Sequence, residues 1–183
     1  IIGANLFFRI GKSIANGVGE AVRSMIEFES ALVGVGKTTN LRGSQLEDLG
    51  REVQALGNKI PIPTNELLKL AETAAQLGVA RENILKFVET AARLGESTNV
   101  SAEDAITALQ RLTIVTGGSQ GDVDRLASSL VALGNKFATT ESEILSMSDQ
   151  LGRATSGFGL SGEQVLGVSA ALTSMGVAAE GGG

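Results

Sequence analysis

The chain has 183 residues, of which 43% are hydrophobic, so it is long enough and apolar enough to bury the core of one or two domains. It contains neither Cys nor His, which excludes disulfides, thiol nucleophiles and most transition-metal sites. The formal net charge is -5, and because the first 40 residues carry four basic and three acidic side chains, the remainder nets -6, which argues against a nucleic-acid clamp.

The aromatic content favours a helical core over a β-sandwich. With six Phe and no Trp or Tyr, the core must be built from Leu, Ile, Val and Ala, which suit close packing of helix on helix. The longest uncharged stretch, residues 164–179, is interrupted by Ser, Thr and Gly and is shorter than the ~20 apolar residues that span a bilayer. Because the chain begins at Ile1 and ends in a glycine run, we expect it to be an excerpt of a longer protein.

Apolar residues recur with the helical period along nearly the whole chain, as in Leu46, Leu49, Val53 and Leu56. The pattern predicts an all-α fold, a multi-helix array of about eight short helices, at 5–38, 44–57, 64–77, 80–95, 101–116, 121–137, 140–155 and 161–176. We divide the chain into an N-terminal amphipathic lead-in helix, residues 1–40, and a helical core domain, residues 41–183.

In the lead-in helix, small residues are spaced so that a second backbone could approach closely: Gly11, Ala15, Gly17, Gly19 and Ala21. Lys12, Glu20 and Arg23 interrupt this stripe, which favours a protein interface in water over a membrane dimer.

The next feature is Gly34–Thr39, Gly-Val-Gly-Lys-Thr-Thr, which resembles the end of a phosphate-binding loop. The first glycine of that motif is replaced by Ala31, and no later strand ends in a Mg²⁺-orienting Asp. We therefore interpret the stretch as the Gly-terminated end of the first helix, with a nucleotide-dependent enzyme centred on Lys37 as a remote alternative.

Helix-start residues recur after this point. Three pairs fit the capping box: Ser44 with Glu47, Thr140 with Glu143, and Ser161 with Gln164. Thr64 and Ser101 resemble simpler caps, and Glu66, Glu103 and Asp104 place negative charge in first turns.

Helix-stop residues recur with them. Glycines that take a left-handed conformation are expected to end the helices at Gly57, Gly78, Gly95, Gly134 and Gly176. Pro61 and Pro63 fall between two helices, where no helical hydrogen bond is lost.

A five-residue sequence occurs twice. Ala-Leu-Gly-Asn-Lys at 55–59 recurs at 132–136, and each copy is followed seven residues after its Lys by Glu66 or Glu143. This points to a duplicated helix-loop-helix unit, and hence to a solenoid, unless the match arose by chance between Ala- and Leu-rich helices.

Acidic pairs also occur along the chain, at Glu27 and Glu29, Glu47 and Asp48, Glu103 and Asp104, and Asp122 and Asp124. Two carboxylates that act on one bond must converge in a cleft, whereas most of these lie at helix starts or on polar faces. Asp122 and Asp124 lack the further oxygen ligands of a calcium loop and are better interpreted as a helix start. We therefore expect no enzyme activity, no catalytic residues, no metal site and no cofactor.

The ordered series of these segments resembles the helical core domain of TP901-type phage tail tape measure proteins. The resemblance extends from about residue 25 to residue 183 and rests on these segments: Phe28-Glu-Ser-Ala-Leu32, Leu46-Glu-Asp-Leu-Gly50, Leu56-Gly57, Leu70-Ala71, Ala74-Ala-Gln-Leu-Gly-Val79, Ser101-Ala-Glu-Asp104, Gly159-Leu-Ser-Gly-Glu163, Ala170-Ala-Leu172, Gly176-Val177 and Gly181-Gly182.

The resemblance implies a structural protein of the virion that occupies the lumen of the tail tube, sets tail length and takes part in tail assembly and DNA ejection. It implies partners as well: further copies of itself, with a trimer favoured, the tail tube protein, distal tail or tail tip proteins, and tail assembly chaperones in the host cytoplasm. Specific nucleic-acid binding by this segment is not expected, and membrane contact is left open.

Two points qualify these expectations. The frequent Gly breaks and the lack of sustained heptads predict a compact module attached to a ruler and not an extended coiled coil. The alternative function, on the residues alone, is a helical protein-protein adaptor or secreted effector module without a ruler role.

Overall fold

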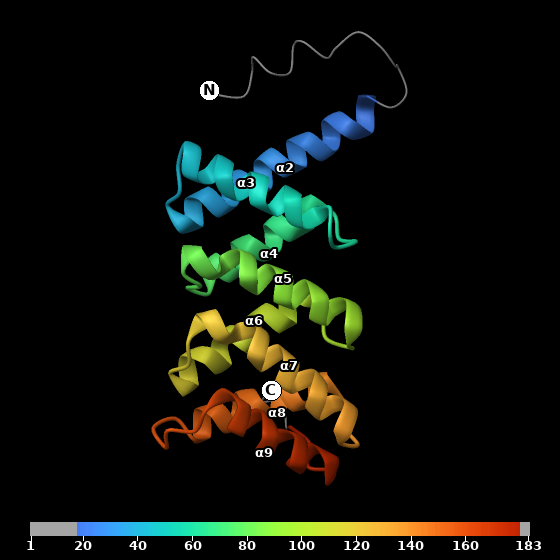
Figure 1. The fold of residues 1–183 in the computed structure, drawn as a ribbon, viewed down its shortest axis with the longest axis vertical. Coiled ribbons are helices and arrows are strands. Elements are labelled where there is room, and N and C mark those ends of the chain that lie inside the picture. Colours follow the sequence, from blue (N-terminus) through green and yellow to red (C-terminus); the bar gives the residue numbers. More distant parts are fainter. Residues whose placement is uncertain (1–17, 180–183) are drawn as a thin grey trace.

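In the computed structural model, residues 18–179 are described, and over this range the chain is all-α, with eight α-helices, one short 3-10 helix and no strand (Figure 1). The elements are α2 Val18–Thr39, α3 Ser44–Gly57, α4 Thr64–Gln76, α5 Arg81–Ser97, α6 Ala102–Thr116, η1 Gln120–Asp122, α7 Val123–Lys136, α8 Glu141–Ala154 and α9 Gly162–Ser174. The all-α class is confirmed, and the predicted helix ends that fall within this range agree to within about two residues.

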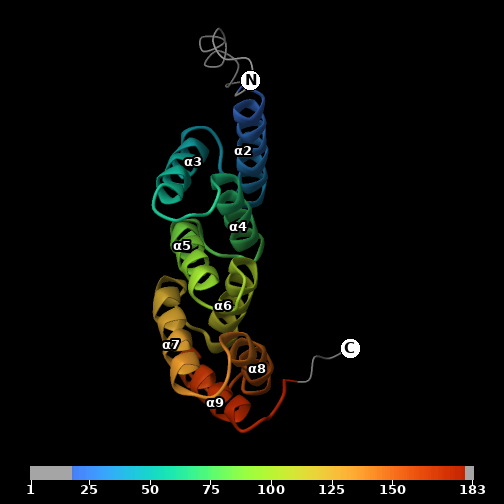
Figure 2. The ribbon, with the colours of Figure 1, turned by 90° about the vertical axis from the view of Figure 1, so that its right-hand side faces the viewer.

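The helices form two columns. Even-numbered helices α2, α4, α6 and α8 stack on one another, and α3, α5, α7 and α9 stack beside them, so that α2 and α9 lie at opposite ends of an elongated molecule (Figure 2). Each helix thus packs against neighbours in its own column and in the other. This is the arrangement of a helical repeat protein, in which each unit contacts only the units next to it.

A single apolar core runs through the stack. Its largest fully buried side chains come from successive helices: Leu67 and Leu68 of α4, Phe87 of α5, Ile106 of α6, Leu130 of α7, Ile144 of α8 and Leu166 of α9. In α5, for example, Ile84, Phe87, Val88 and Ala91 follow the three- and four-residue spacing that puts them on one helix face.

The predicted duplication belongs to a longer recurrence. The two five-residue copies lie at the C-terminal ends of α3 and α7, and Leu94-Gly95 of α5 occupies the same place between them. Leu56-Gly57, Leu94-Gly95 and Leu133-Gly134 are therefore separated by 38 and 39 residues. The sequence comparison missed the middle copy because only its Leu-Gly pair is retained.

Three of the five expected helix-stop glycines were predicted wrongly. Gly78 and Gly176 do take positive φ, 80° and 83°, but Gly57, Gly95 and Gly134 are helical. Each of these three lies against the first residue of the following helix, seven positions on, so that a Cβ at Gly57 would lie 2.8 Å from Oγ1 of Thr64. The absence of a side chain at these positions serves close packing and not chain reversal.

Of the five helix caps expected from the sequence, three are formed and two are not. Ser101 caps α6, and the capping boxes of α8 at Thr140 and of α9 at Ser161 are both formed, as predicted. Ser44 and Thr64 are wrong: each is the first helical residue, and Gly43 and Pro63 occupy the cap positions without a side-chain hydrogen bond.

Candidate stacking surfaces

The loop-like stretch Gly34–Thr39 is helical and closes α2. The hydroxyls of Thr38 and Thr39 donate to the carbonyls of Gly34 and Val35, at 3.0 and 2.7 Å. Asn40, at φ 57°, takes the left-handed conformation after the helix, so the stretch ends α2 as predicted, although without a terminal glycine. A helix directs its amides along its own axis, so these residues do not form the phosphate cradle of a nucleotide-binding loop.

The acidic pairs lie at helix starts and on exposed surface. Glu103 and Asp104 occupy the first turn of α6, where Ser101 Oγ donates to Asp104 Oδ2 at 2.6 Å. Asp122 and Asp124 begin α7 through η1, as predicted. Within residues 18–179 the structure contains no group of three acidic side chains positioned to hold a metal ion.

None of the described helices is both long enough and apolar enough to cross a membrane. The small-residue stripe from Gly11 to Gly17 lies outside the described residues, and of its remaining members, Gly19 and Ala21, only the backbone is described, as part of α2. The interface predicted there stays a prediction.

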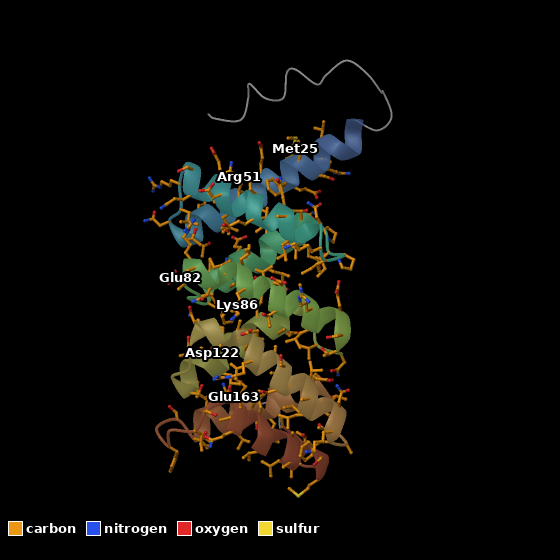
Figure 3. All side chains as sticks on the ribbon, viewed as in Figure 1. Met25, Arg51, Glu82, Lys86, Asp122 and Glu163 are labelled. Carbon is orange, nitrogen blue, oxygen red and sulfur yellow. The ribbon has the colours of Figure 1, made fainter. Side chains whose placement is uncertain are left out.

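The most regular polar feature is a pair of salt bridges that join successive odd-numbered helices. Lys86 of α5 contacts Asp124 of α7 at 2.8 Å, and Arg125 of α7 contacts Glu163 of α9 at 2.6 Å. Both partners of the second pair lie 39 residues after those of the first, so the contact follows the repeat. Lys86, Asp122 and Glu163 accordingly succeed one another down one side of the stack (Figure 3).

Three of these groups have shifted pKa values. The hydrogen bond from Lys86 lowers the pKa of Asp124, and the guanidinium of Arg125 has its pKa raised by the hydrogen bond it donates to Glu163. The pKa of Glu163 is lowered first by its own backbone amide, in the first turn of α9, and further by Arg125. All three shifts favour the charged forms that make the contacts between helices.

Two amide side chains supply further contacts between units. The Oε1 of Gln120 accepts from the backbone amide of Ala80 at 2.8 Å, and its Nε2 donates to the carbonyl of Gly78 at 3.0 Å. Asn99, in the loop before α6, donates to Ser142 Oγ at 2.8 Å and accepts from the Ser142 amide. Sequence reasoning missed both residues because a single polar residue between two α-helices carries no signal for a partner about 40 residues away.

The polar contacts described above each join one helix or loop of the stack to another. A groove of about 520 Å³ between α5 and α7 is lined by small, apolar and neutral polar side chains together with Arg93 and Asp124.

Comparison with protein families gives a match over residues 50–183, which is more than half of the chain and covers α4 to α9 together with most of α3. The matching family is described as phage-related minor tail protein. Comparisons with curated proteins and with solved structures give no match.

Proposed function

The chain belongs to the phage-related minor tail protein family, and from this premise we propose that it is a segment of the tape measure protein of a long-tailed phage or phage-derived particle. A member of this family is a phage tail protein, and its place is the tail of the virion. The proposal is narrower: the parent protein lies in the lumen of the tail tube, sets tail length and leaves during DNA ejection.

The observation that carries this proposal is that the family match extends over most of one continuous, elongated stack of helices. An elongated repeat protein offers long lateral surfaces for contact, which suits a structural component better than an enzyme. We include as partners further copies of the chain, with a trimer favoured, the tail tube protein, tail tip proteins and tail assembly chaperones.

This particular segment acts as a module of stacked helices attached to the ruler and not as the ruler itself. Stacked helices lie about 10 Å apart, so a unit of two helices adds roughly 10 Å to the length of the stack. A continuous helix of the same 39 residues would add about 58 Å, because it rises 1.5 Å per residue. A stacked segment therefore adds much less length per residue than a continuous helix does.

Internal deletions in the gene that carries this sequence test the proposal. If the protein is the tape measure, deletions elsewhere in the gene shorten the tail in proportion to the residues removed, as measured by electron microscopy of purified virions. Deletion of residues 86–124, one unit of the stack, shortens it by only about 10 Å. Tails of unchanged length in the whole deletion series would favour an adaptor without a ruler role.

A further inference from the structure

Helix α3 has the least extensive packing of the described α-helices. It lies mainly on α4 and touches α2 and α5 only lightly, whereas α5 packs along α4, α6 and α7 (Figure 2). Place in the stack does not by itself account for this, because α9, the last described helix, packs extensively on both α7 and α8. The buried side of α3 is a narrow stripe of Leu49, Gly50, Val53 and Leu56, so its attachment depends on few side chains.

Polar contacts of the kind that join the other odd-numbered helices do not link α3 to its neighbours within residues 18–179. The two salt bridges described above join α5 to α7 and α7 to α9. The positions 39 residues before Lys86 and Asp124 are Glu47 and Leu85, and Leu85 has no charge to pair with Glu47. The salt bridge that α3 does carry joins two of its own residues. Hence α3 is attached to the other described helices by apolar contact alone.

The segments on either side of α3 separate it from the helices that precede and follow it. Asn40 and Gly43, before α3, have positive φ values of 57° and 56°, so the chain turns sharply there. Pro61 and Pro63 follow α3, and neither has an amide hydrogen with which to extend a helix across the loop. Detachment of α3 therefore does not require α2 or α4 to unwind.

Helices α2 and α4, which α3 partly covers, pack on each other independently of it. Their contact is the most extensive between any two described helices, and Asn65 of α4 donates to Glu27 of α2 at 3.0 Å. A Cβ at Gly50 of α3 would lie 3.2 Å from Cδ2 of Leu32 and 3.6 Å from Cζ of Phe28, both on α2. Detachment of α3 would therefore leave the other described helices joined and would uncover apolar side chains of α2.

We propose that α3 is a lid that opens locally and reversibly while α2 and α4–α9 stay folded, and that its opening uncovers Phe28 and Leu32. A region with few buried contacts opens at a lower free energy than global unfolding requires. The light packing of α3, its attachment by apolar contact and the helix breaks at both of its ends all favour opening at this helix in particular. This inference goes beyond the tape measure role and does not depend on it.

Single cysteines can report the opening, because the chain contains no Cys of its own. Three buried valines supply matched positions: Val53 on α3 and Val88 on α5 are fully buried, and Val165 on α9 is 1% exposed. Each is changed to Cys in the full chain, and the reaction of its thiol with 5,5′-dithiobis(2-nitrobenzoate) is followed at about pH 8. We expect Val53→Cys to react at least about tenfold faster than Val88→Cys and Val165→Cys.

Urea at concentrations below the unfolding transition separates local opening from global unfolding. Local opening exposes little new surface, so the labelling rate of Val53→Cys should depend only weakly on urea, whereas labelling at Val88→Cys should rise steeply. A steep dependence for Val53→Cys, or equal rates at these two positions, would overturn the proposal. Fast labelling of Val165→Cys with weak urea dependence would overturn it too, because opening would then not be specific to α3.

Hydrogen exchange of the unsubstituted chain, measured by mass spectrometry, excludes an effect of the substitutions themselves. We expect peptides from α3 to exchange at least about tenfold faster than peptides from α4, the helix on which α3 mainly lies. Exchange of α3 and α4 at one common rate would show that the two helices open together, and the lid would then not exist.

Discussion

At the scale of single residues, the N-terminal caps are contributions to stability that one substitution can isolate. Thr140 accepts from the Glu143 amide, and Glu143 reaches back to the Thr140 amide at 2.9 Å, so both orphan donors are satisfied. We expect Thr140→Ala to lower the free energy of unfolding by about 1 kcal/mol, measured by urea denaturation. Ser44→Ala is the control, because Ser44 makes no cap bond, and its effect should stay within a few tenths of a kcal/mol. Equal effects of the two changes would contradict the assignment of caps.

The acidic partners predict how stability depends on pH. The pKa values of Asp124, Glu143 and Glu163 are lowered in the folded chain, for Glu143 chiefly by the Thr140 amide. A carboxyl with a lowered folded pKa contributes stability above its unfolded pKa, and that stability is lost as the pH falls through the folded value. The melting temperature should therefore be nearly constant from about pH 5.5 to 7.5, where a chain without His has little to titrate, and should fall below about pH 4.

A double variant isolates these groups from general acid effects. Glu143→Gln with Glu163→Gln should flatten the fall in melting temperature below about pH 4, whereas Glu52→Gln with Glu96→Gln, at two exposed positions, should leave the slope unchanged. Identical slopes for the two double variants would show that the capped and paired carboxyls do not govern acid unfolding.

At the scale of the helices, a glycine inside a helix has two opposing effects on stability. Its low helix propensity destabilises the helix, but its lack of a side chain lets a neighbouring helix pack closely. A Cβ at Gly95 would lie 3.1 Å from the backbone nitrogen of Ala102, while a Cβ at Gly167, inside α9, would meet no heavy atom within 4 Å. We expect Gly167→Ala to stabilise the chain by about 0.5–1 kcal/mol, as helix propensity predicts. The free energy of unfolding of Gly95→Ala should be at least about 1 kcal/mol lower than that of Gly167→Ala, because the start of α6 must shift to make room for the added Cβ. Thermal and urea unfolding of both variants measure the difference, and equal gains would contradict the packing role.

Helix boundaries could be predicted from the sequence because their determinants are local. Apolar periodicity and the caps at Ser101, Thr140 and Ser161 each act within a turn or two of helix. Ser44 and Thr64 were misassigned because cap and first-turn positions favour the same residue types, and only the backbone conformation of Gly43 and Pro63 distinguishes them.

The arrangement of the helices could be anticipated only in outline. The repeated Ala-Leu-Gly-Asn-Lys segment identified two units, but the third retains only Leu94-Gly95, since the packing needs a residue without a side chain and an apolar neighbour and leaves the rest free. The contacts of Gln120 and Asn99 depend on which helices become neighbours, so neither residue had a local signal.

At the scale of the whole molecule, a stack of equivalent units should tolerate the loss of one complete unit. Deletion of residues 86–124 joins Leu85 to Arg125 across equivalent positions of α5 and α7. It removes both partners of the Lys86–Asp124 pair and keeps the Arg125–Glu163 pair. Because each unit contacts only its neighbours, we expect the shortened chain to remain helical and to unfold in one cooperative transition.

A deletion of half a unit supplies the control for this prediction. Removing residues 86–105 joins the start of α5 to the middle of α6, so the apolar faces that follow no longer meet their partners in either column. Circular dichroism should give a mean helicity per residue close to that of the parent chain for the whole-unit deletion and a lower value, with a broad thermal transition, for the half-unit deletion. If the two deletions were equally folded, register between units would not matter and the repeat of 38 to 39 residues would not be a structural unit. If both were unfolded, the stack would be a single cooperative core and not a sum of neighbouring contacts.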